Sequence, residues 1–176
     1  FDPQNGANQA MRFGSNLPAF LEPLCAIAQQ LLPAHLSARS PSFDQMIANL
    51  YCPGEGIIPH IDLARFEDGI VIFSFLSPLV MDFQRVDTTQ SLRDGYKLVS
   101  NNGSDVSHAV SGTSSIMSVG VLLEPGSAIC LSGESRYAWT HGITERLSDS
   151  FEGRDFRRGK RISITLRKMK PNQSES

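Results

Sequence analysis

The stretch IVIFSFLSPLVMDF, at residues 70–83, decides the fold class. Residues 70–76 and 79–83 are runs of β-branched and aromatic side chains, and Ser77-Pro78 between them is typical of a turn. Apolar runs of this length favour buried strands. We therefore predict two neighbouring buried strands at this point of the chain.

Further short runs of the same kind lie on both sides of this pair. A PGEG turn occupies residues 53–56, and a charged loop is expected at 147–159. Several short strands separated by turn signals predict a mainly β protein, a double-sheet jelly roll (double-stranded β-helix) with a flanking helix. The other expected strands lie at residues 43–51, 57–62, 122–123, 128–131, 138–143 and 160–169.

One helix is expected near the amino terminus. Residues 1–16 have the composition of a polar loop, Asn16 is a candidate cap, and Pro18 fits the first helical turn. Pro33 then ends the helix. The apolar residues that recur at helical spacing, and that we expect to pack on the core, are Leu17, Phe20, Leu21, Leu24, Ala28 and Leu31.

The length of 176 residues suits a single domain. Its core is expected at residues 49–170, with the helix in residues 1–48. Residues 84–120 are rich in Ser, Thr, Asn and Gly and predict an insertion on the rim of the domain. Because the sequence opens at Phe1 without a methionine, we expect it to be part of a longer protein with flanking domains.

Composition excludes few functions. The chain is 40% hydrophobic and 19% charged, as in ordinary globular proteins, and its net charge of −2 gives no global attraction to nucleic acid, although local patches can still bind it. Cys25, Cys52 and Cys130 form no C-x-x-C pair, which favours a reducing intracellular compartment, cytoplasmic or nuclear. No apolar run approaches membrane-spanning length, so no membrane partner is expected.

Basic residues gather near the carboxyl end of the chain, where Asp155 is the only acid between Arg154 and Lys170. A solvated face and an edge that contacts phosphates explain such a run equally well. The basic residues are Arg154, Arg157, Arg158, Lys160, Arg161, Arg167, Lys168 and Lys170.

Two histidines and one carboxylate are candidate metal ligands. His60 and Asp62 are two residues apart in IIPHID, so on a strand their side chains point the same way. His141 lies in WTHGI, on another expected strand. Two imidazoles and one carboxylate form the facial triad that holds non-haem Fe(II). A surface His–Asp pair and a structural histidine are the alternatives, and the spacing leaves them open.

The last strand, RISITLR, has a polar and an apolar face. Its polar face either meets solvent, as on a half-exposed strand, or lines a cavity. The planar fork of arginine binds carboxylates through two hydrogen bonds. Two such residues could hold both ends of a dicarboxylate, or one could brace a metal-binding carboxylate. Asn49 and Tyr51 share a face just before the metal pair. The residues of the polar face are Arg161, Ser163, Thr165 and Arg167.

The order of these motifs resembles a known family. N-x-Y-x-P-G, H-x-D, an HGI-type histidine and R-x5-R are together similar to the AlkB family of Fe(II)- and 2-oxoglutarate-dependent dioxygenases, over about residues 49–168. PHID followed by FED, then VMDF, GESRYAWTHGIT and RISITLRK look most like the AlkB-like branch that acts on tRNA wobble uridines. The resemblance implies a jelly roll and an oxidative reaction.

The resemblance also implies a role for each matching residue. The ligands of Fe(II) would be His60, Asp62 and His141. The residues that contact the cosubstrate 2-oxoglutarate would be Asn49, Tyr51, Arg161, Ser163 and Arg167. Among these, Arg161 and Tyr51 would hold the distal carboxylate, and Asn49 and Arg167 would lie near the metal-bound end, where Arg167 could also brace Asp62. O2 would be the other cosubstrate.

The substrate implied by the resemblance is a methylated or modified base in single-stranded DNA or RNA, including tRNA. It would be demethylated or hydroxylated by a monomeric enzyme. A protein-directed oxygenase on the same scaffold is the alternative, and the intact site residues disfavour a non-catalytic binding module. The family's lid over the nucleotide, in residues 1–48, is short here. Its only candidate aromatics for base stacking are Phe13 and Phe43, and core packing is the alternative for both.

Overall fold

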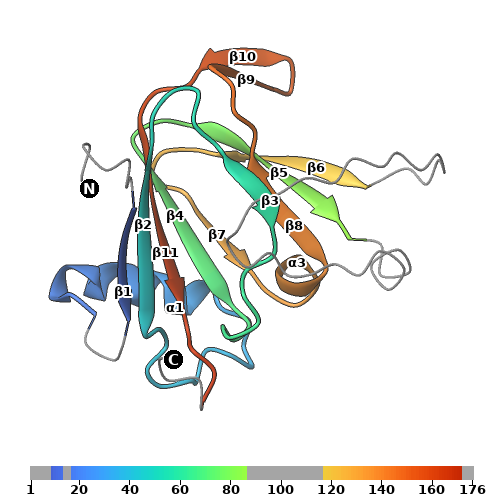
Figure 1. Cartoon of the computed structure of the whole chain (residues 1–176). Helices are drawn as coiled ribbons and strands as arrows, with labels where there is room; N and C mark the ends of the chain where they lie inside the picture. The colour runs from blue at the N-terminus through green and yellow to red at the C-terminus, as the bar shows by residue number, and fades with distance from the viewer. Residues whose placement is uncertain (1–8, 14–16, 87–116, 172–176) are drawn as a thin grey trace, which may run out of the picture.

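Two β-sheets packed face to face form most of the part of the chain that the computed structural model describes, residues 9–13, 17–86 and 117–171 (Figure 1). The architecture is mainly β with a flanking helix, as predicted. The elements are β1 (Gln9–Phe13), a 3-10 turn η1 (Ala19–Leu21), α1 (Glu22–Leu31), β2 (Gln45–Tyr51), β3 (Ile57–His60), β4 (Ile70–Phe75), β5 (Leu79–Arg85), β6 (Ser118–Leu123), β7 (Ala128–Leu131), α3 (Glu134–Tyr137), β8 (Trp139–Ile143), β9 (Ser148–Phe151), β10 (Arg154–Arg157) and β11 (Arg161–Arg167).

The strand order explains how distant motifs meet. One sheet has the order β1-β2-β11-β4-β7 and the other β3-β8-β5-β6, and β9 pairs with β10 in a separate hairpin. All pairings are antiparallel among the described strands. From β2 to β5 the chain changes sheet at each connection, so β11 returns between β2 and β4, and β8 returns between β3 and β5. This is the jelly-roll arrangement.

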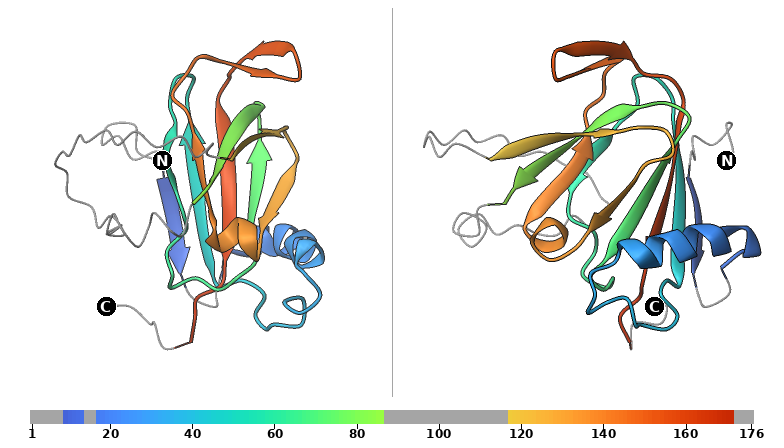
Figure 2. Two further views of the ribbon diagram at one scale, coloured as in Figure 1. Left: turned by 90° about the vertical axis from the view of Figure 1, so that its right-hand side faces the viewer. Right: turned by 180° about the vertical axis from the view of Figure 1, so that it is seen from behind.

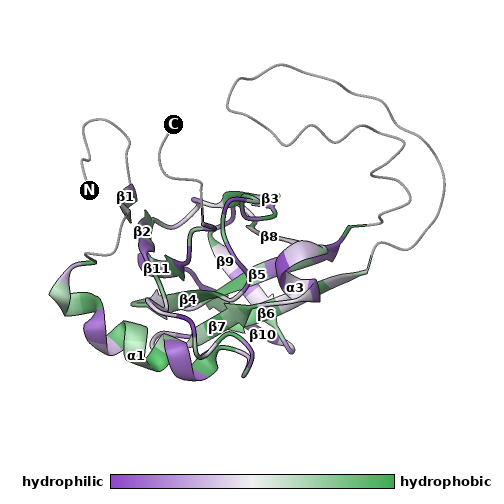
Figure 3. Ribbon diagram, turned by 90° about the horizontal axis from the view of Figure 1, so that it is seen from below, coloured by the Kyte–Doolittle hydropathy of each residue, from purple (hydrophilic) through white to green (hydrophobic). Residues whose placement is uncertain are grey.

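The strand β4 is buried on both faces because the protein has three layers. Val71 and Phe73 pack under α1, while Ile70 and Ile72 face the other sheet. Figure 2 shows α1 lying across the outer face of the β2-β11-β4 layer, and Figure 3 shows α1 on one side of that layer with β3 and β8 on the other. The continuous apolar run at residues 70–76 is therefore explained. Phe43 is a core residue as well, whereas the side chain of Phe13 lies outside the described residues.

The amino-terminal helix begins later than predicted. The chain forms the 3-10 turn after Pro18 and becomes α-helical only at Glu22, with Leu21 as an N-cap that makes no side-chain capping bond. The proposed cap Asn16 lies outside the described residues. The end of the helix agrees with the prediction, because Leu32, which precedes Pro33, is extended. No helix in the described ranges is long and apolar enough to cross a membrane.

Two segments predicted as loops are strands. Residues 9–13 form β1, an edge strand whose backbone pairs with β2. Residues 148–157 form the β9–β10 hairpin, which stands at one end of the molecule (Figure 2). Its two-residue turn has positive φ at both Glu152 (49°) and Gly153 (75°), as a type I′ turn requires. The predicted insertion at 84–120 begins and ends in paired strand, β5 and β6, and its residues 87–116 lie outside the described chain.

A buried ion pair anchors the hairpin. Nε and one terminal nitrogen of Arg158 donate to the two carboxylate oxygens of Asp149, at 2.6 and 2.8 Å, and the other terminal nitrogen donates to the Thr144 carbonyl at 2.7 Å. The Val80 amide, in β5, also donates to Asp149. Burial opposes ionisation of Asp149, but these hydrogen bonds and one from Arg146 outweigh it, so the pKa of Asp149 lies below its ordinary value.

The basic run near the carboxyl end is divided by this fold. Arg154, Arg157 and Lys160 are exposed, whereas Arg158 and Arg161 are buried. Neither predicted reading, a solvated face or a phosphate-contacting edge, holds for the whole run. Of the two buried arginines, Arg158 anchors the hairpin and Arg161 lies in the interior between the sheets.

We expect Asp149→Asn to lower the free energy of unfolding at pH 7 by about 3 kcal/mol, because Arg158 would remain buried without its anion. The contribution of Asp149 is complete above the ordinary carboxyl range and is lost as pH falls through its lowered pKa, so the difference between the two proteins should narrow in acid. Urea unfolding at several pH values measures this. Asp155→Asn, on the exposed part of the same hairpin, is the control, and an equal loss in both variants would contradict the assignment.

Candidate metal and cosubstrate site

The two histidines meet across the β3–β8 pair. His60 lies directly opposite His141 in the antiparallel register, and their ring centroids are 4.5 Å apart. Asp62 follows the end of β3. The candidate ligand atoms of the three residues all lie within 4.8 Å of one another, so the group could hold a metal ion. The predicted constellation is thus brought together by the fold, and the surface-pair alternative fails for Asp62, which is buried.

A glycine allows the two strands to come this close. A Cβ atom on Gly142 would lie 2.9 Å from the backbone N and Cα of Pro59. Contacts this short do not occur with real Cβ atoms, and the backbone opposite cannot rotate away as a side chain would. Gly142, beside His141, and Pro59, beside His60, are therefore part of the metal geometry. This close approach explains why a glycine follows His141 in HGI and why it faces the proline that precedes His60 in PH.

Hydrogen bonding orients the His60 ring toward a metal. Nδ1 of His60 lies 2.9 Å from the Ile58 carbonyl oxygen, and because a carbonyl only accepts, Nδ1 carries the proton. Nε2 then keeps its lone pair for a ligand, which is the usual arrangement of metal-binding histidines. Burial lowers the pKa of His141 to about 4, although Asp62 opposes this shift. His141 is therefore neutral, and able to coordinate, at physiological pH.

Asp62 has one satisfied and one unsatisfied oxygen. A terminal nitrogen of Arg167 lies 2.5 Å from Oδ1 and forms an ion pair with it. Oδ2 is buried, has no hydrogen-bond partner in the part of the chain that the structure describes, and lies 3.7 Å from Nε2 of His141. A buried carboxylate oxygen rarely lacks a partner, so this one requires an explanation. A cation held between Asp62 and the two imidazoles supplies it, and the donor set of two nitrogens and one oxygen suits Fe(II).

Arg167 already forms an ion pair with Asp62, so its charge is balanced without a ligand. Its guanidinium also lies 4.7 Å from the centre of the Phe66 ring. Burial lowers the pKa of Arg167, and the negative charge of Asp62 opposes that shift. Of the two roles considered for this arginine, bracing the metal-binding carboxylate is the one that the geometry favours.

Arg161 is buried without an acidic partner among the described residues. It is 1% exposed, and one terminal nitrogen donates to the Ser74 hydroxyl at 2.8 Å, while its Nε has no partner. Its guanidinium lies 5.4 Å from the centre of the Tyr51 ring. Burial lowers the pKa of Arg161 to about 10, far above neutrality, so the cation persists. A buried cation that lacks an anion is a site for a carboxylate ligand.

The remaining predicted residues lie beside Arg161. Tyr51 is directly opposite Arg161, and Asn49 directly opposite Ser163, in the β2–β11 register. A side-chain hydrogen bond joins Tyr51 and Ser163; burial, the largest influence, raises the pKa of Tyr51. Nε2 of Gln9, in β1, donates to Oδ1 of Asn49 at 2.6 Å. These side chains form a continuous row that we call the polar strip, which consists of Arg161, Tyr51, Ser163, Asn49 and Gln9.

The polar face of β11 lines the interior rather than meeting solvent. Arg161, Ser163 and Thr165 are all buried, while Ile164 and Leu166 on the opposite face pack under α1. The half-exposed strand was the ordinary explanation for this alternation, and it is wrong. The reason is the third layer, since α1 covers the apolar face and leaves the polar face toward the other sheet.

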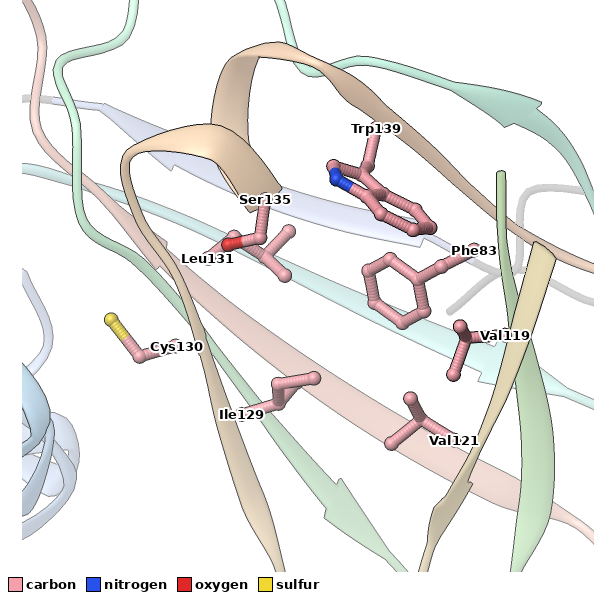
Figure 4. A pocket seen from close by; sticks show the side chains of 8 residues that line it. All are labelled: Phe83, Val119, Val121, Ile129, Cys130, Leu131, Ser135 and Trp139. Atoms are coloured by element: carbon pink, nitrogen blue, oxygen red, sulfur yellow. The ribbon is translucent and has the colours of Figure 1, made fainter. Parts of the chain in front are cut away.

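The opposite end of the interior is apolar. A hollow of about 250 Å³ lies between β5, β6, β7 and α3, and Figure 4 shows its lining. Phe83 separates it from the metal site, with its ring centroid 6.1 Å from that of His141. Among the described residues, the lining of this hollow includes no charged side chain, and its polar groups are those of Ser135, Cys130 and Trp139. A dicarboxylate therefore has no partner there, and the polar strip is the better site.

Three contributors were missed from the sequence. Ser74 interrupts the apolar run of β4, and a hydroxyl in such a run was an available signal for a buried polar contact. Gln9 gave no signal, because its role depends on the pairing of β1 with β2. Arg136, within the quoted GESRYAWTHGIT motif, is 2% exposed and contacts the segment after β3.

The chain matches a family model and several curated proteins. The model described as the 2OG-Fe(II) oxygenase superfamily matches residues 6–167. The chain is 33% identical over 156 residues to the "Alkylated DNA repair protein ALKBH8 homolog" of Arabidopsis thaliana, covering 88% of this chain and 42% of that protein. It is 34% identical over 144 residues to the "tRNA (carboxymethyluridine(34)-5-O)-methyltransferase ALKBH8" of Macaca fascicularis, covering 72% of this chain and 18% of that protein.

A solved structure shares the fold. OsALKBH1 superposes with a TM-score of 0.51 at 16% sequence identity, over 84% of this chain and 65% of that one. At this identity the likeness concerns the fold alone, and it confirms the predicted jelly roll. The chain spans less than half the length of the two curated relatives named above.

We expect Asp62→Ala to abolish tight binding of Fe(II) or of its spectroscopic substitute Co(II), because two imidazoles alone leave the facial triad incomplete. Anaerobic metal titration followed by absorbance measures this. Asp82→Ala, a partly exposed carboxylate in β5, is the control and should bind the metal as the parent does. Tight metal binding by Asp62→Ala would remove this residue from the ligand set.

Proposed function

Since this chain belongs to the 2OG-Fe(II) oxygenase superfamily as an AlkB-like member, we propose that it oxidises methylated or modified bases in nucleic acid, with His60, Asp62 and His141 as its iron ligands. The enzyme is a dioxygenase whose cofactor system is Fe(II), 2-oxoglutarate and O2. The observation that carries the site assignment is the clustering of His60, Asp62 and His141, whose candidate ligand atoms all lie within 4.8 Å of one another.

The two arginines of β11 have different tasks. Arg167 is already paired with Asp62, whereas Arg161 has no acidic partner among the described residues. Arg161 and Tyr51 would therefore hold the distal carboxylate of 2-oxoglutarate alone, through charge-assisted hydrogen bonds. Arg167 would act at the other end through Asp62, which it already contacts. Asn49 and Ser163 lie between these ends and would contact the body of the cosubstrate.

The protein's share of the chemistry is positioning and exclusion of water. Iron with 2-oxoglutarate and O2 supplies the oxidising power that hydroxylates a C–H bond, releasing succinate and CO2. Arg167 holds Asp62 in place through their ion pair. His60 is held by the Ile58 carbonyl, and burial keeps His141 unprotonated. If the hydroxylated carbon is an N-methyl group, the product loses formaldehyde; otherwise the hydroxyl remains.

Two observations support a nucleic-acid substrate. The Arabidopsis relative is named for repair of alkylated DNA and the macaque relative for a tRNA uridine, although the chain spans only 42% and 18% of them. Arg154, Arg157 and Lys160 are exposed on or beside the β9–β10 hairpin and could contact phosphates. A base must leave its stack to reach a buried iron, so single strands and loops are the favoured targets.

We expect Arg161→Met to raise the concentration of 2-oxoglutarate needed for half-maximal turnover by about 10- to 100-fold, because a buried charge-assisted hydrogen bond is lost. Metal affinity should not change. Steady-state succinate formation at varied 2-oxoglutarate measures this, with Lys160→Met, an exposed neighbour, as control. An unaltered requirement in Arg161→Met would place the cosubstrate elsewhere.

We expect methylated single-stranded RNA, or tRNA, to stimulate succinate formation, and the stimulation to fall steeply as salt increases. An Arg154→Gln, Arg157→Gln double variant should need more RNA while keeping its affinity for metal and 2-oxoglutarate. Duplex RNA of the same sequence is the matched control substrate. Turnover that no DNA or RNA stimulates would reject the nucleic-acid proposal and leave a protein-directed oxygenase as the better reading.

A further inference from the structure

A buried arginine outside the ligand set holds the segment that carries Asp62. Arg136 lies in α3 and is 2% exposed. One terminal nitrogen donates to the carbonyl of Asp62 at 2.9 Å, and the other donates to the carbonyls of Leu63, at 2.9 Å, and Phe66, at 3.2 Å. A single guanidinium therefore collects three carbonyls within five residues of chain.

The segment that Arg136 holds is anchored by backbone pairing at its far end, where Phe66 forms an isolated bridge with Met169 and the Lys170 amide donates to the Arg65 carbonyl, but not at Asp62. Residues 61–63 follow β3 and belong to no strand, so no sheet partner fixes the peptide planes there. The direction of the Asp62 side chain follows from its backbone, and the backbone is oriented by the bond from Arg136. Below it, the Phe66 ring is fully buried and lies under Arg167, the residue that binds Oδ1 of Asp62. Arg136 thus acts on both the backbone and the partner of this ligand.

Arg136 also belongs to the segment that delivers the second histidine. α3 ends at Tyr137 and β8 begins at Trp139, so His141 follows Arg136 by five residues. A return contact strengthens the connection, since the Asp68 carboxylate accepts the Gly133 amide at 3.0 and 3.1 Å. The segment with Asp62 and the segment with His141 are therefore joined by two opposed contacts, of which only Arg136 reaches the ligand residue itself.

We propose that Arg136 is a positioning residue that sets the placement of Asp62 relative to His141 and thereby the affinity and geometry of the metal site. This inference rests on the proposed assignment of the metal ligands. Lysine cannot replace Arg136 fully, because an ammonium is a compact donor and lacks the planar fork that spans three carbonyls. Residues that orient metal ligands typically contribute 10- to 100-fold to metal affinity.

The test compares Arg136→Met with Arg158→Met by anaerobic Co(II) titration and Co(II) absorption spectra. Arg158 is the matched control, because it is also a buried arginine that holds a backbone carbonyl, that of Thr144, while its hydrogen bonds reach none of the three candidate ligand residues. We expect Arg136→Met to weaken Co(II) binding at least about tenfold and to change the spectrum. Arg158→Met should lower stability while the folded protein keeps both the affinity and the spectrum of the parent.

Parent-like affinity and spectrum in Arg136→Met would overturn the proposal and leave Arg136 a purely structural residue. If Arg136→Met does not fold, Arg136→Lys decides: we expect intermediate affinity and an altered spectrum, and a parent-like result would equally overturn the proposal. The parent protein separates the two levels of inference. Failure of the parent to bind Co(II) would reject the ligand assignment itself, whereas an unaltered variant beside a binding parent rejects only the role of Arg136.

Discussion

The close antiparallel pairing of β3 with β8 is the constraint on which the candidate site depends. It places His60 opposite His141, and it exists at this distance because Gly142 presents no Cβ to the backbone of Pro59. Packing alone would tolerate several spacings between two strands, but two imidazoles can share one ion only when a donor nitrogen of each ring lies within coordination distance of it. The sheet therefore determines the nitrogen ligands, and the carboxylate must be brought to them by the irregular segment after β3.

Two buried arginines, Arg158 and Arg161, and the largely buried Arg167 show how the same side chain takes different tasks according to its anion. Arg158 has Asp149 and anchors a hairpin, and Arg167 has Asp62 and orients a ligand. Arg161 is buried as deeply but, within the described residues, has only a hydroxyl partner. Because a buried guanidinium without a counter-ion is costly, the imbalance itself indicates a carboxylate ligand. Neither burial nor residue type alone would have separated these three cases.

Much of this could be predicted from the sequence wherever one residue's own pattern was sufficient. The apolar run at 70–76 and the two faces of RISITLR are local periodicities, and the structure contains both. His60 and Asp62 do meet, but β3 ends at His60 rather than at residue 62, so the strand periodicity from which this was predicted is not the reason. Which face of β11 meets the interior could not be predicted from the strand's own sequence, because it depends on α1 covering the other face. The strand at 9–13 and the hairpin at 148–157 were missed for a similar reason. The strand is stabilised by backbone pairing with β2 and the hairpin by the Arg158–Asp149 contact, and neither interaction can be recognised from the residue pattern of the segment alone.

The candidate metal position lies at the boundary between a polar and an apolar half of the interior, and this has a chemical consequence. The polar strip from Asn49 to Arg161 offers groups that bind carboxylate oxygens, while Phe83 stands on the other side of His141. Apolar surroundings disfavour the charged imidazolium, which is why the pKa of His141 falls to about 4. A metal ion binding near neutral pH then displaces no proton from His141, so the whole donor strength of the ring is available to it. The same burial leaves Oδ2 of Asp62 without a hydrogen-bond partner among the described residues. A cation bound at this position would contact both that oxygen and the neutral ring of His141.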